Sequence, residues 1–388
     1  MTTPRLRILH VIDSLWGGGA EVSMVEHLRA DASHPDREHH LVALRGNGPT
    51  RHAASRLGVE TTLGPPGIRP RWSDVALIRD AVRRARPAVV HCVLQRSTQA
   101  TALALARSPI PMVVTLTSVA YQVEDRAGSI KQRVGTRLFH ALHGIALRRP
   151  RVTIRAVSQP VADRACEIFG LDPTDVTVVP DLRTDPRGLV TRSRAQVRRE
   201  LSIPETAPVL ITVAREHPIK DHVTLLEVAA LLRTGVPDLR LVLAGSPGLA
   251  SPGIDAAIAR HGLEHTVVRL GHRDDVPDLL VASDLFVSAS TSEGLGAAAV
   301  EALGSGLPVV AVDNPGIREV LGADHPGLVP ARDAEALAAT TARLLADSNL
   351  RLRICVEGRA RFDRLFEMEA NIDRIADVFR AAVRRAGG

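Results

Sequence analysis

Two glutamates eight residues apart, Glu293 and Glu301, could bind two different groups of one ligand. Glu293 follows the apolar run at residues 284–290, and Glu301 precedes the apolar run at residues 308–313. Both runs predict buried parallel strands. The stretch between the runs predicts a loop and then a short alanine-rich helix. Such a loop lies at the carboxyl ends of the strands, where open α/β sheets bind ligands. Its N–H groups at the positive helix end suit a phosphate, and they belong to Gly294, Leu295, Gly296 and Ala297. Carboxylates on either side of a phosphate indicate a nucleotide-sugar site.

Two further groups could contribute to this chemistry. Arg215 and Lys220 follow the predicted strand 208–214, where two cations can neutralise a diphosphate without a metal. The chain has only two lysines, so a lysine at this strand end is informative, although solvated surface charge is the alternative. Three glycines, Gly17, Gly18 and Gly19, follow the first predicted strand and allow the backbone to approach a ligand closely. A turn needed only for chain reversal is the alternative for this loop.

The elements that must position these residues form two series of alternating strands and helices. This alternation predicts an α/β fold with two Rossmann-like, doubly wound domains, separated by a polar linker at residues 181–193. The carboxyl-terminal stretch has helical spacing and is expected to pack back on the first domain. We therefore predict an acceptor-binding domain at residues 1–183, a donor-binding domain at 184–366 and a returning helix at about 367–388.

Composition narrows the class of protein. The net charge is +6, but arginines are scattered among 43 acidic residues and aromatics make up only 2%, which argues against nucleic-acid binding. Three dispersed cysteines and the lack of a long apolar run predict a cytoplasmic protein. No metal site is expected, since His39 and His40 read as a strand start. A basic amphipathic helix at residues 128–150 leaves open a peripheral contact with an anionic inner membrane face, although packing on its own domain is the commoner role.

A dinucleotide fingerprint is an alternative interpretation of the same loop. Gly294, Gly296 and Ala299 follow a predicted strand, and Asp313 ends the next strand. This pattern is typical of an NAD(P)-dependent oxidoreductase. It leaves the two glutamates and the two cations without roles.

Taken together, these residues resemble the family-4 retaining glycosyltransferases of GT-B fold. The resemblance runs along nearly the whole chain and is most specific around the glutamate pair, Glu293 and Glu301. Around the pair lie a Gly-x-Pro-Val-Val segment at residues 306–310 and the NPGIREV segment with Gly316 and Glu319. The GGGAE segment resembles the glycine loop of the family, and Arg215 with Lys220 resembles its diphosphate clamp.

The resemblance implies that the donor is a nucleoside diphosphate sugar, with UDP or GDP as the nucleotide, bound in a cleft between the domains. Glu293 would face the sugar hydroxyls and Glu301 would hold the ribose. Arg215, Lys220 and the amides of residues 294–297 would stabilise the departing diphosphate. No cofactor and no metal are implied. The leaving phosphate assists deprotonation of the acceptor, so neither glutamate acts as a hydrolase nucleophile.

Two departures from the family pattern stand out. The family commonly has a histidine near the donor sugar, and this chain has Thr117 there. The family also commonly ends the first domain in Pro-Asn-Gly, where this chain has Pro180, Asp181 and Leu182. The first change leaves the sugar open, and it leaves a catalytically silent donor-binding subunit as a second alternative. No sequence pattern identifies the acceptor.

Overall fold

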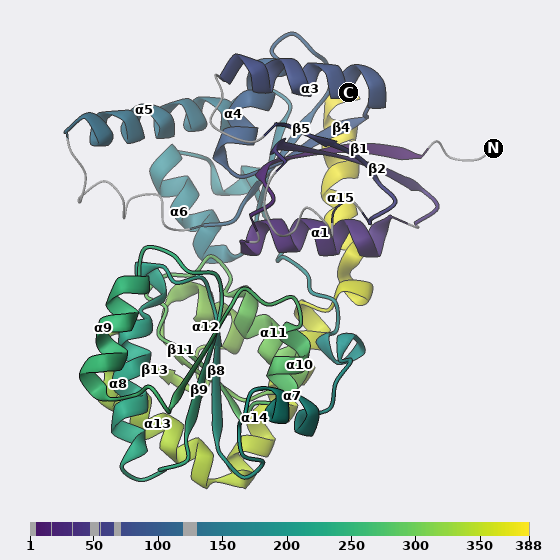
Figure 1. Cartoon of the computed structure of the whole chain (residues 1–388). Coiled ribbons are helices and arrows are strands. Elements are labelled where there is room, and N and C mark those ends of the chain that lie inside the picture. The colour runs from purple at the N-terminus through teal and green to yellow at the C-terminus, as the bar shows by residue number, and fades with distance from the viewer. Residues whose placement is uncertain are drawn as a thin grey trace. The chain divides into compact units, whose positions relative to one another are not determined.

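The computed structural model describes residues 5–16, 18–32, 34–46, 54, 56–65, 71–118 and 130–387, with side chains at 71 and 130–137 outside the description. The chain divides into two compact units (Figure 1). Unit 1 comprises Met1–Leu182 and Met368–Gly388, and unit 2 comprises Arg183–Glu367. Each unit is described below by itself.

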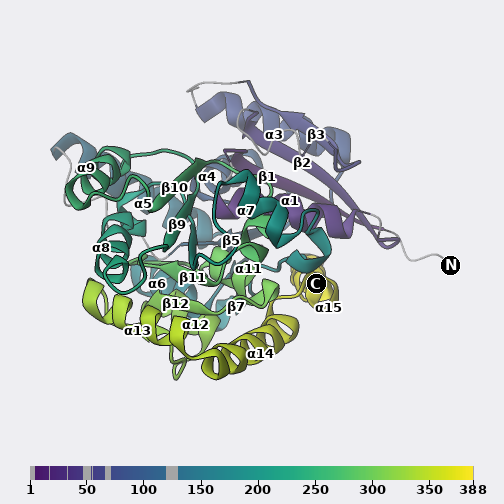
Figure 2. The same ribbon diagram turned by 60° about the horizontal axis from the view of Figure 1, so that its bottom comes forward.

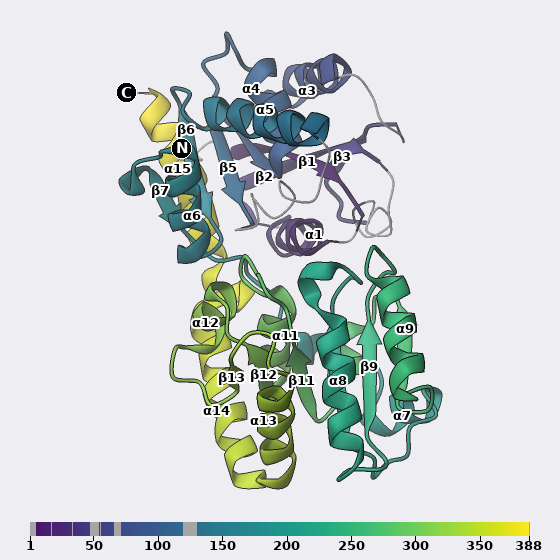
Figure 3. The same ribbon diagram turned by 90° about the vertical axis from the view of Figure 1, so that its left-hand side faces the viewer.

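Unit 1 is built on a seven-stranded parallel sheet with the order β3-β2-β1-β4-β5-β6-β7. Helices α3, α4 and α5 lie on one face of the sheet, and α1 and α15 lie on the other (Figures 1 and 3). The strands are β1 (Leu6–Ser14), β2 (Arg37–Arg45), β3 (Glu60–Leu63), β4 (Val89–Val93), β5 (Met112–Leu116), β6 (Val152–Ala156) and β7 (Val176–Val178). The helices are α1 (Gly19–Asp31), α3 (Arg71–Ala85), α4 (Gln95–Ala104), α5 (Ile130–Leu147), α6 (Gln159–Phe169) and α15 (Met368–Gly387), with the short η2 (Pro173–Asp175).

Burial on both faces explains why these strands read as continuous apolar runs. All five residues of β4 and of β5 are buried. Helix α15 covers the sheet with an apolar stripe that includes Ile375 and Phe379, and both pack in one core cluster with Ile8, Val89 and Val113. The last helix of the chain is therefore part of the first core.

Unit 2 is built on a six-stranded parallel sheet with the order β10-β9-β8-β11-β12-β13. Helices α8, α9 and α13 lie on one face, and α7, α10, α11 and α14 lie on the other (Figures 1 and 2). The strands are β8 (Val209–Val213), β9 (Arg240–Ala244), β10 (Val267–Gly271), β11 (Leu285–Ser288), β12 (Val309–Val312) and β13 (Leu328–Val329). The helices are α7 (Arg194–Glu200), α8 (His222–Arg233), α9 (Ser251–His261), α10 (Val276–Val281), α11 (Ala297–Ser305), α12 (Pro315–Leu321), α13 (Ala334–Ala346) and α14 (Ser348–Leu365), with the short η3 (Pro186–Leu189) and η4 (Pro218–Lys220).

The predicted α/β class with two doubly wound parallel sheets is confirmed. The predicted linker at residues 181–193 contains the boundary between the two units, and much of it is fixed to unit 2. The backbone N–H of Thr191 donates to Asp278 over 2.7 Å, and Arg359 pairs with Asp185 over 2.8 Å. Polar residues of this segment are therefore ion-pair and hydrogen-bond partners of unit 2. In the part of the chain that the structure describes, no helix combines the length and apolar composition needed to cross a bilayer.

A buried imidazole in unit 1 gives a pH prediction. The His143 ring of α5 packs against Phe169, with ring centroids 5.3 Å apart, and burial lowers the pKa of His143 from 6.5 to about 4. The folded state keeps this ring neutral, so its contribution to stability is present above pH 6.5 and is lost as the pH falls toward 4. The loss is about 3 kcal/mol at 1.36 kcal/mol per pKa unit. Urea unfolding at pH 7 and pH 4 measures this loss. Between the two pH values, the free energy of unfolding of His143→Leu is expected to fall by about 3 kcal/mol less than that of wild type.

The matched control is His265→Leu, which removes an exposed histidine in unit 2. This variant should show the wild-type pH dependence. Equal pH dependence in His143→Leu and wild type would contradict the assignment of a neutral buried ring.

Candidate functional site

Lys220 and Glu293 form an ion pair at the carboxyl edge of the unit 2 sheet. The Nζ of Lys220 lies 2.6 Å from Oε1 of Glu293, and both side chains are half-buried. Lys220 ends η4 after β8, and Glu293 lies in the loop after β11. These strands are sheet neighbours, while the chain leaves β8 toward β9 on its other side. The pair therefore lies at a topological switch point, where doubly wound sheets bind ligands.

The loop that carries Glu293 is held by its neighbours in a fixed backbone path. Its residue Thr291 donates its N–H to the carbonyl of Ile219 over 2.9 Å, which ties the two strand ends together. Asn314 Nδ2 donates to the Ser290 carbonyl over 2.9 Å. A Cβ at Gly316 would lie 2.4 Å from the carbonyl oxygen of Glu293, so only glycine allows this approach. The position of the Glu293 carboxylate thus depends on residues of α12.

The four residues predicted to present N–H groups lie at the start of α11. Gly296 is the N-cap with φ of +77°, a left-handed conformation that favours glycine. Ala297 is the first helical residue, and Gly294 and Leu295 precede the cap. The helix ends at Ser305, and Gly306 is its C-cap in a left-handed conformation. The first turn therefore has the positive end that suits an anion.

Glu301 has a partner that the sequence did not predict. Arg183 Nε donates to Oε1 of Glu301 over 3.0 Å, and the Arg183 side chain is only 2% exposed. Burial raises the pKa of the Glu301 carboxyl above its ordinary value, although Arg183 acts in the opposite direction. Arg183 lies in the predicted linker, and in a chain whose cations are almost all arginines nothing in its sequence position distinguishes it.

Arg215 is placed differently from Lys220. It follows β8 and is exposed, and its guanidinium forms no ion pair with a described residue. The next residue, Glu216, is buried and pairs with Arg269 and Ser251. Glu216 fixes the loop between β8 and η4, while Arg215 projects from it.

The glycine loop of unit 1 is only partly described, since Gly17 lies outside the described residues. Gly18 caps α1 in an extended conformation, and Gly19 is the first residue of the helix. A Cβ at Gly18 would lie 2.6 Å from Oε2 of Glu21, and the other carboxylate oxygen, Oε1, accepts a hydrogen bond from Ser14 over 3.2 Å. Burial raises the pKa of nearby Asp13 to about 6. A phosphate at this helix end would therefore meet a carboxylate that is already there.

Thr117 lines a small pocket of unit 1, with an accessible volume of about 20 Å³. This volume is room for about one water molecule. The buried Arg155 beside it donates to the carbonyls of Val179 and Pro180 and to Asp181, each over 2.8–2.9 Å. The residues that line the pocket are Ala20, Ser23, Met24, His27, His91, Val93, Thr115, Thr117, Arg155, Asp181, Leu182 and Ile375.

A chain of buried imidazoles runs from this pocket across the sheet. His91 Nε2 lies 2.7 Å from Thr115 Oγ1, and His91 Nδ1 lies 2.9 Å from His10 Nδ1. His10 Nε2 in turn lies 2.9 Å from His39 Nδ1. Burial lowers the pKa of His10 and of His91 well below the ordinary value, so these rings are neutral. The sequence does not predict this chain of imidazoles and hints at it only through a histidine inside each of three apolar runs.

Comparison with known proteins gives a consistent family. Residues 193–361 match the family model described as Glycosyl transferases group 1, and residues 17–181 match Glycosyltransferase Family 4. A D-inositol 3-phosphate glycosyltransferase of Thermobispora bispora is 32% identical over 66% of this chain and 67% of its own length. A 2-deoxystreptamine N-acetyl-D-glucosaminyltransferase of Streptomyces fradiae is 30% identical over 87% of this chain and 82% of its own length.

Solved structures show the same fold. The Anabaena HepE structure in complex with UDP-glucose has a TM-score of 0.82 at 20% identity, covering 97% of this chain and 99% of that one. The structure of WaaG, a glycosyltransferase involved in lipopolysaccharide biosynthesis, has a TM-score of 0.76 at 16% identity, covering 96% and 99%.

Proposed function

Because the chain belongs to glycosyltransferase family 4, a retaining family of GT-B fold that uses nucleotide sugars, we propose that Lys220 and Glu293 bind the reacting part of the donor. The observation that supports this most is their 2.6 Å ion pair at the switch point of the unit 2 sheet. Both groups are half-buried and lie beside the positive end of α11.

The two charges suit the two ends of the bond that breaks. Cleavage of the anomeric bond leaves negative charge on the diphosphate and positive charge on the sugar ring. The Lys220 ammonium and the first turn of α11 stabilise the diphosphate, since fixed charges aimed at developing charge lower the barrier most. Glu293 accepts hydrogen bonds from sugar hydroxyls. Arg215, exposed on the same loop system, supplies a second cation to the phosphates.

Glu301 is proposed to hold the ribose. It lies in α11 about one turn beyond the phosphate-binding end, and the buried Arg183 fixes the carboxylate through Oε1. A fixed carboxylate accepts hydrogen bonds from two neighbouring hydroxyls without losing side-chain freedom on binding. Neither glutamate is a nucleophile, and the leaving phosphate takes the acceptor proton. The transfer step uses no metal and no cofactor.

UDP is the nucleotide we propose first, because the similar HepE structure contains UDP-glucose. For Gly18 and Gly19 we propose close backbone approach to a ligand rather than phosphate binding, since Glu21 places a negative charge there, and Gly17 lies outside the described residues. The acceptor is open. The curated relatives are named for D-inositol 3-phosphate and 2-deoxystreptamine, and these two compounds are the first acceptors to test.

Thermal unfolding with a nucleotide panel tests the binding part of the proposal. UDP or GDP at 100 times its Kd is expected to stabilise the protein by about 2.7 kcal/mol, and NAD(P) to have no effect. Glu301→Ala should weaken this stabilisation. Stabilisation by NAD(P) alone would overturn the proposal.

We further propose that the protein is cytoplasmic and contacts an anionic membrane through α5. In the described part of this helix, Leu138 is 61% exposed and Ile145 is 62% exposed, with Leu142 between them at 39%. Their spacing puts them along one stripe. The sequence also predicts basic residues on this helix, namely Lys131, Arg133 and Arg137. Their side chains are not among those that the structure describes.

Sedimentation with vesicles tests the membrane contact. Wild type is expected to bind vesicles that contain anionic lipid and to stay in solution with zwitterionic vesicles. A Leu138→Glu/Ile145→Glu variant should lose most of this binding. The control is Leu249→Glu, which charges another exposed leucine in unit 2. Equal binding by all three proteins would contradict the contact.

A further inference from the structure

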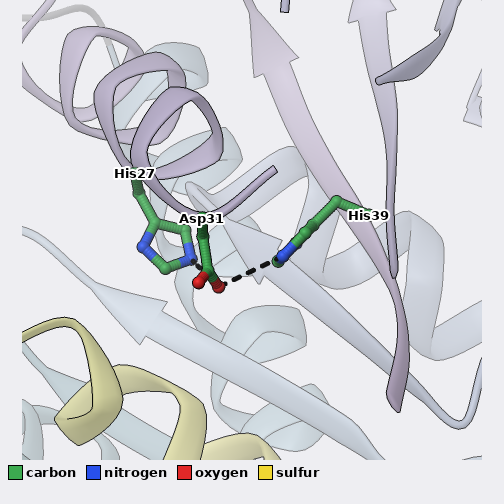
Figure 4. Close-up of side chains that lie close together, drawn as sticks. All are labelled: His27, Asp31 and His39. Atoms are coloured by element: carbon green, nitrogen blue, oxygen red, sulfur yellow. Dashed lines mark ion pairs between the residues drawn. The ribbon is translucent and has the colours of Figure 1, made fainter. Parts of the chain in front are cut away.

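Three buried side chains of unit 1 converge on one point. His27 and Asp31 lie one turn apart on α1, and His39 lies on β2. All three are buried. Figure 4 shows the two imidazoles on either side of the Asp31 carboxylate, each with a ring nitrogen toward it. One nitrogen or oxygen from each residue lies within 4.8 Å of the other two.

The ligand atoms of these three groups are close enough together to share one ion. Asp31 Oδ2 lies 3.1 Å from His39 Nε2 and 3.9 Å from His27 Nε2. Both ring nitrogens of the buried His27 have no hydrogen-bond partner among the described residues. Buried polar atoms are nearly always paired, so such a group requires an explanation. Two ligands of a tetrahedral zinc ion, each at about 2.0–2.1 Å, lie about 3.3–3.4 Å apart.

The groups behind the three side chains are arranged as supports for metal ligands. Arg37 Nη1 lies 2.8 Å from Oδ1 of Asp31, which leaves Oδ2 facing the histidines. The other ring nitrogen of His39, Nδ1, lies 2.9 Å from His10. Ligating carboxylates and imidazoles typically have a second partner of this kind, which fixes their orientation. The Arg37 charge is itself compensated by Asp36 and Asp373, at 3.1 and 2.5 Å.

We propose that His27 Nε2, Asp31 Oδ2 and His39 Nε2 bind one Zn²⁺ ion that pins α1 to β2. Two imidazoles and a carboxylate are a ligand set of zinc, and water completes four-coordination. His27 also lines the pocket that has room for about one water molecule. No metal site is expected from the sequence, where His39 reads with His40 as a strand start and not with the helix before them. This site is separate from the transfer chemistry, so it does not depend on the proposed function.

Zinc at this point determines where the protons of the imidazole chain lie. With the metal on Nε2 of His39, Nδ1 of that ring carries the proton and donates to His10 Nε2. His10 then donates through Nδ1 to His91, and His91 donates through Nε2 to Thr115 Oγ1. The distances of 2.9, 2.9 and 2.7 Å permit each of these bonds. The ion therefore fixes the tautomers as far as the pocket that Thr117 lines.

Metal content measures the proposal directly. Full-length protein made in zinc-supplemented medium and passed through a desalting column is expected to retain about one zinc ion per chain by mass spectrometry of the metal. His27→Gln and His39→Gln should retain less than about a tenth of that amount. His143→Gln, which changes a buried histidine of the same unit outside the cluster, should keep the full amount. Removal of zinc by unfolding in a chelator should lower the Tm on refolding, and added Zn²⁺ should restore it.

Cobalt gives a readout that needs no variant. Wild type refolded with Co²⁺ is expected to show the intense visible absorption of a four-coordinate ion. Wild type that holds no zinc, shows no Tm change with Zn²⁺ and gives only the weak absorption of hydrated Co²⁺ would overturn the proposal. Full zinc content in a folded His27→Gln variant would overturn it as well.

Discussion

Replacing Lys220 by alanine is expected to lower kcat/KM for sugar transfer by about 100- to 1,000-fold. The Lys220 ammonium is half-buried and lies against Glu293, with 2.6 Å between Nζ and Oε1. Its loss leaves the diphosphate charge to Arg215 and the helix end, and it leaves Glu293 without its ion-pair partner. Steady-state kinetics with the nucleotide sugar measure the effect, and most of the loss should be in kcat.

Two comparisons make this prediction specific. Arg260→Ala removes an exposed charge from the same unit and should leave kcat/KM unchanged. Glu293→Gln should also be severely impaired. Because Lys220 and Glu293 contact each other, the double variant should lose less than the product of the two single losses. Wild-type activity in Lys220→Ala would show that the diphosphate lies elsewhere.

Gly316→Ala is expected to have the second-largest effect, about 100-fold on kcat/KM. The new Cβ would lie 2.4 Å from the Glu293 carbonyl oxygen and 2.9 Å from its carbon, so the loop that carries Glu293 must move. These neighbours are backbone atoms and cannot rotate away. A displacement of this size also costs stability of about 1–3 kcal/mol. Kinetics and urea unfolding measure the two effects.

Gly253→Ala is the matched control for this substitution. Gly253 lies in α9, and the nearest atom to its new Cβ is Val223 Cγ2 at 3.9 Å. Alanine in a helix is favoured over glycine, so stability should rise by about 0.5–1 kcal/mol with activity unchanged. A Gly316→Ala variant that behaves like Gly253→Ala would show that the loop does not depend on this close approach.

The fold could be predicted from sequence because its parallel strands are buried on both faces. Apolar runs such as residues 89–93 and 285–288 contain the pattern by themselves, and short polar loops separate them. The family could be predicted from Glu293 and Glu301, and the family assignment is confirmed. The alternative of an NAD(P)-dependent oxidoreductase, based on Gly294, Gly296 and Ala299, is set aside by that assignment. In the structure Gly296 is a helix cap that packs against Ile317.

The contacts that tune the site could not be predicted in the same way. Arg183 reaches Glu301 across 118 positions of sequence, and the chain is rich in arginine, so no local pattern selects this pair. The imidazole chain joins three strands whose order in the sheet must be known first. His27, Asp31 and His39 converge only because α1 packs beside β2. The roles of Glu293, Glu301, Arg215 and Lys220 in donor binding stay predictions.

The most direct test of the central claim is the release of nucleoside diphosphate from a panel of nucleotide sugars, with the anomeric configuration of the product determined by NMR. D-inositol 3-phosphate and 2-deoxystreptamine are the first acceptors. Wild type is expected to release UDP or GDP from one sugar donor, to retain the anomeric configuration, and to lose this activity in Glu293→Gln. Inversion of configuration, or full activity in a Glu293→Gln/Lys220→Ala variant, would contradict the account.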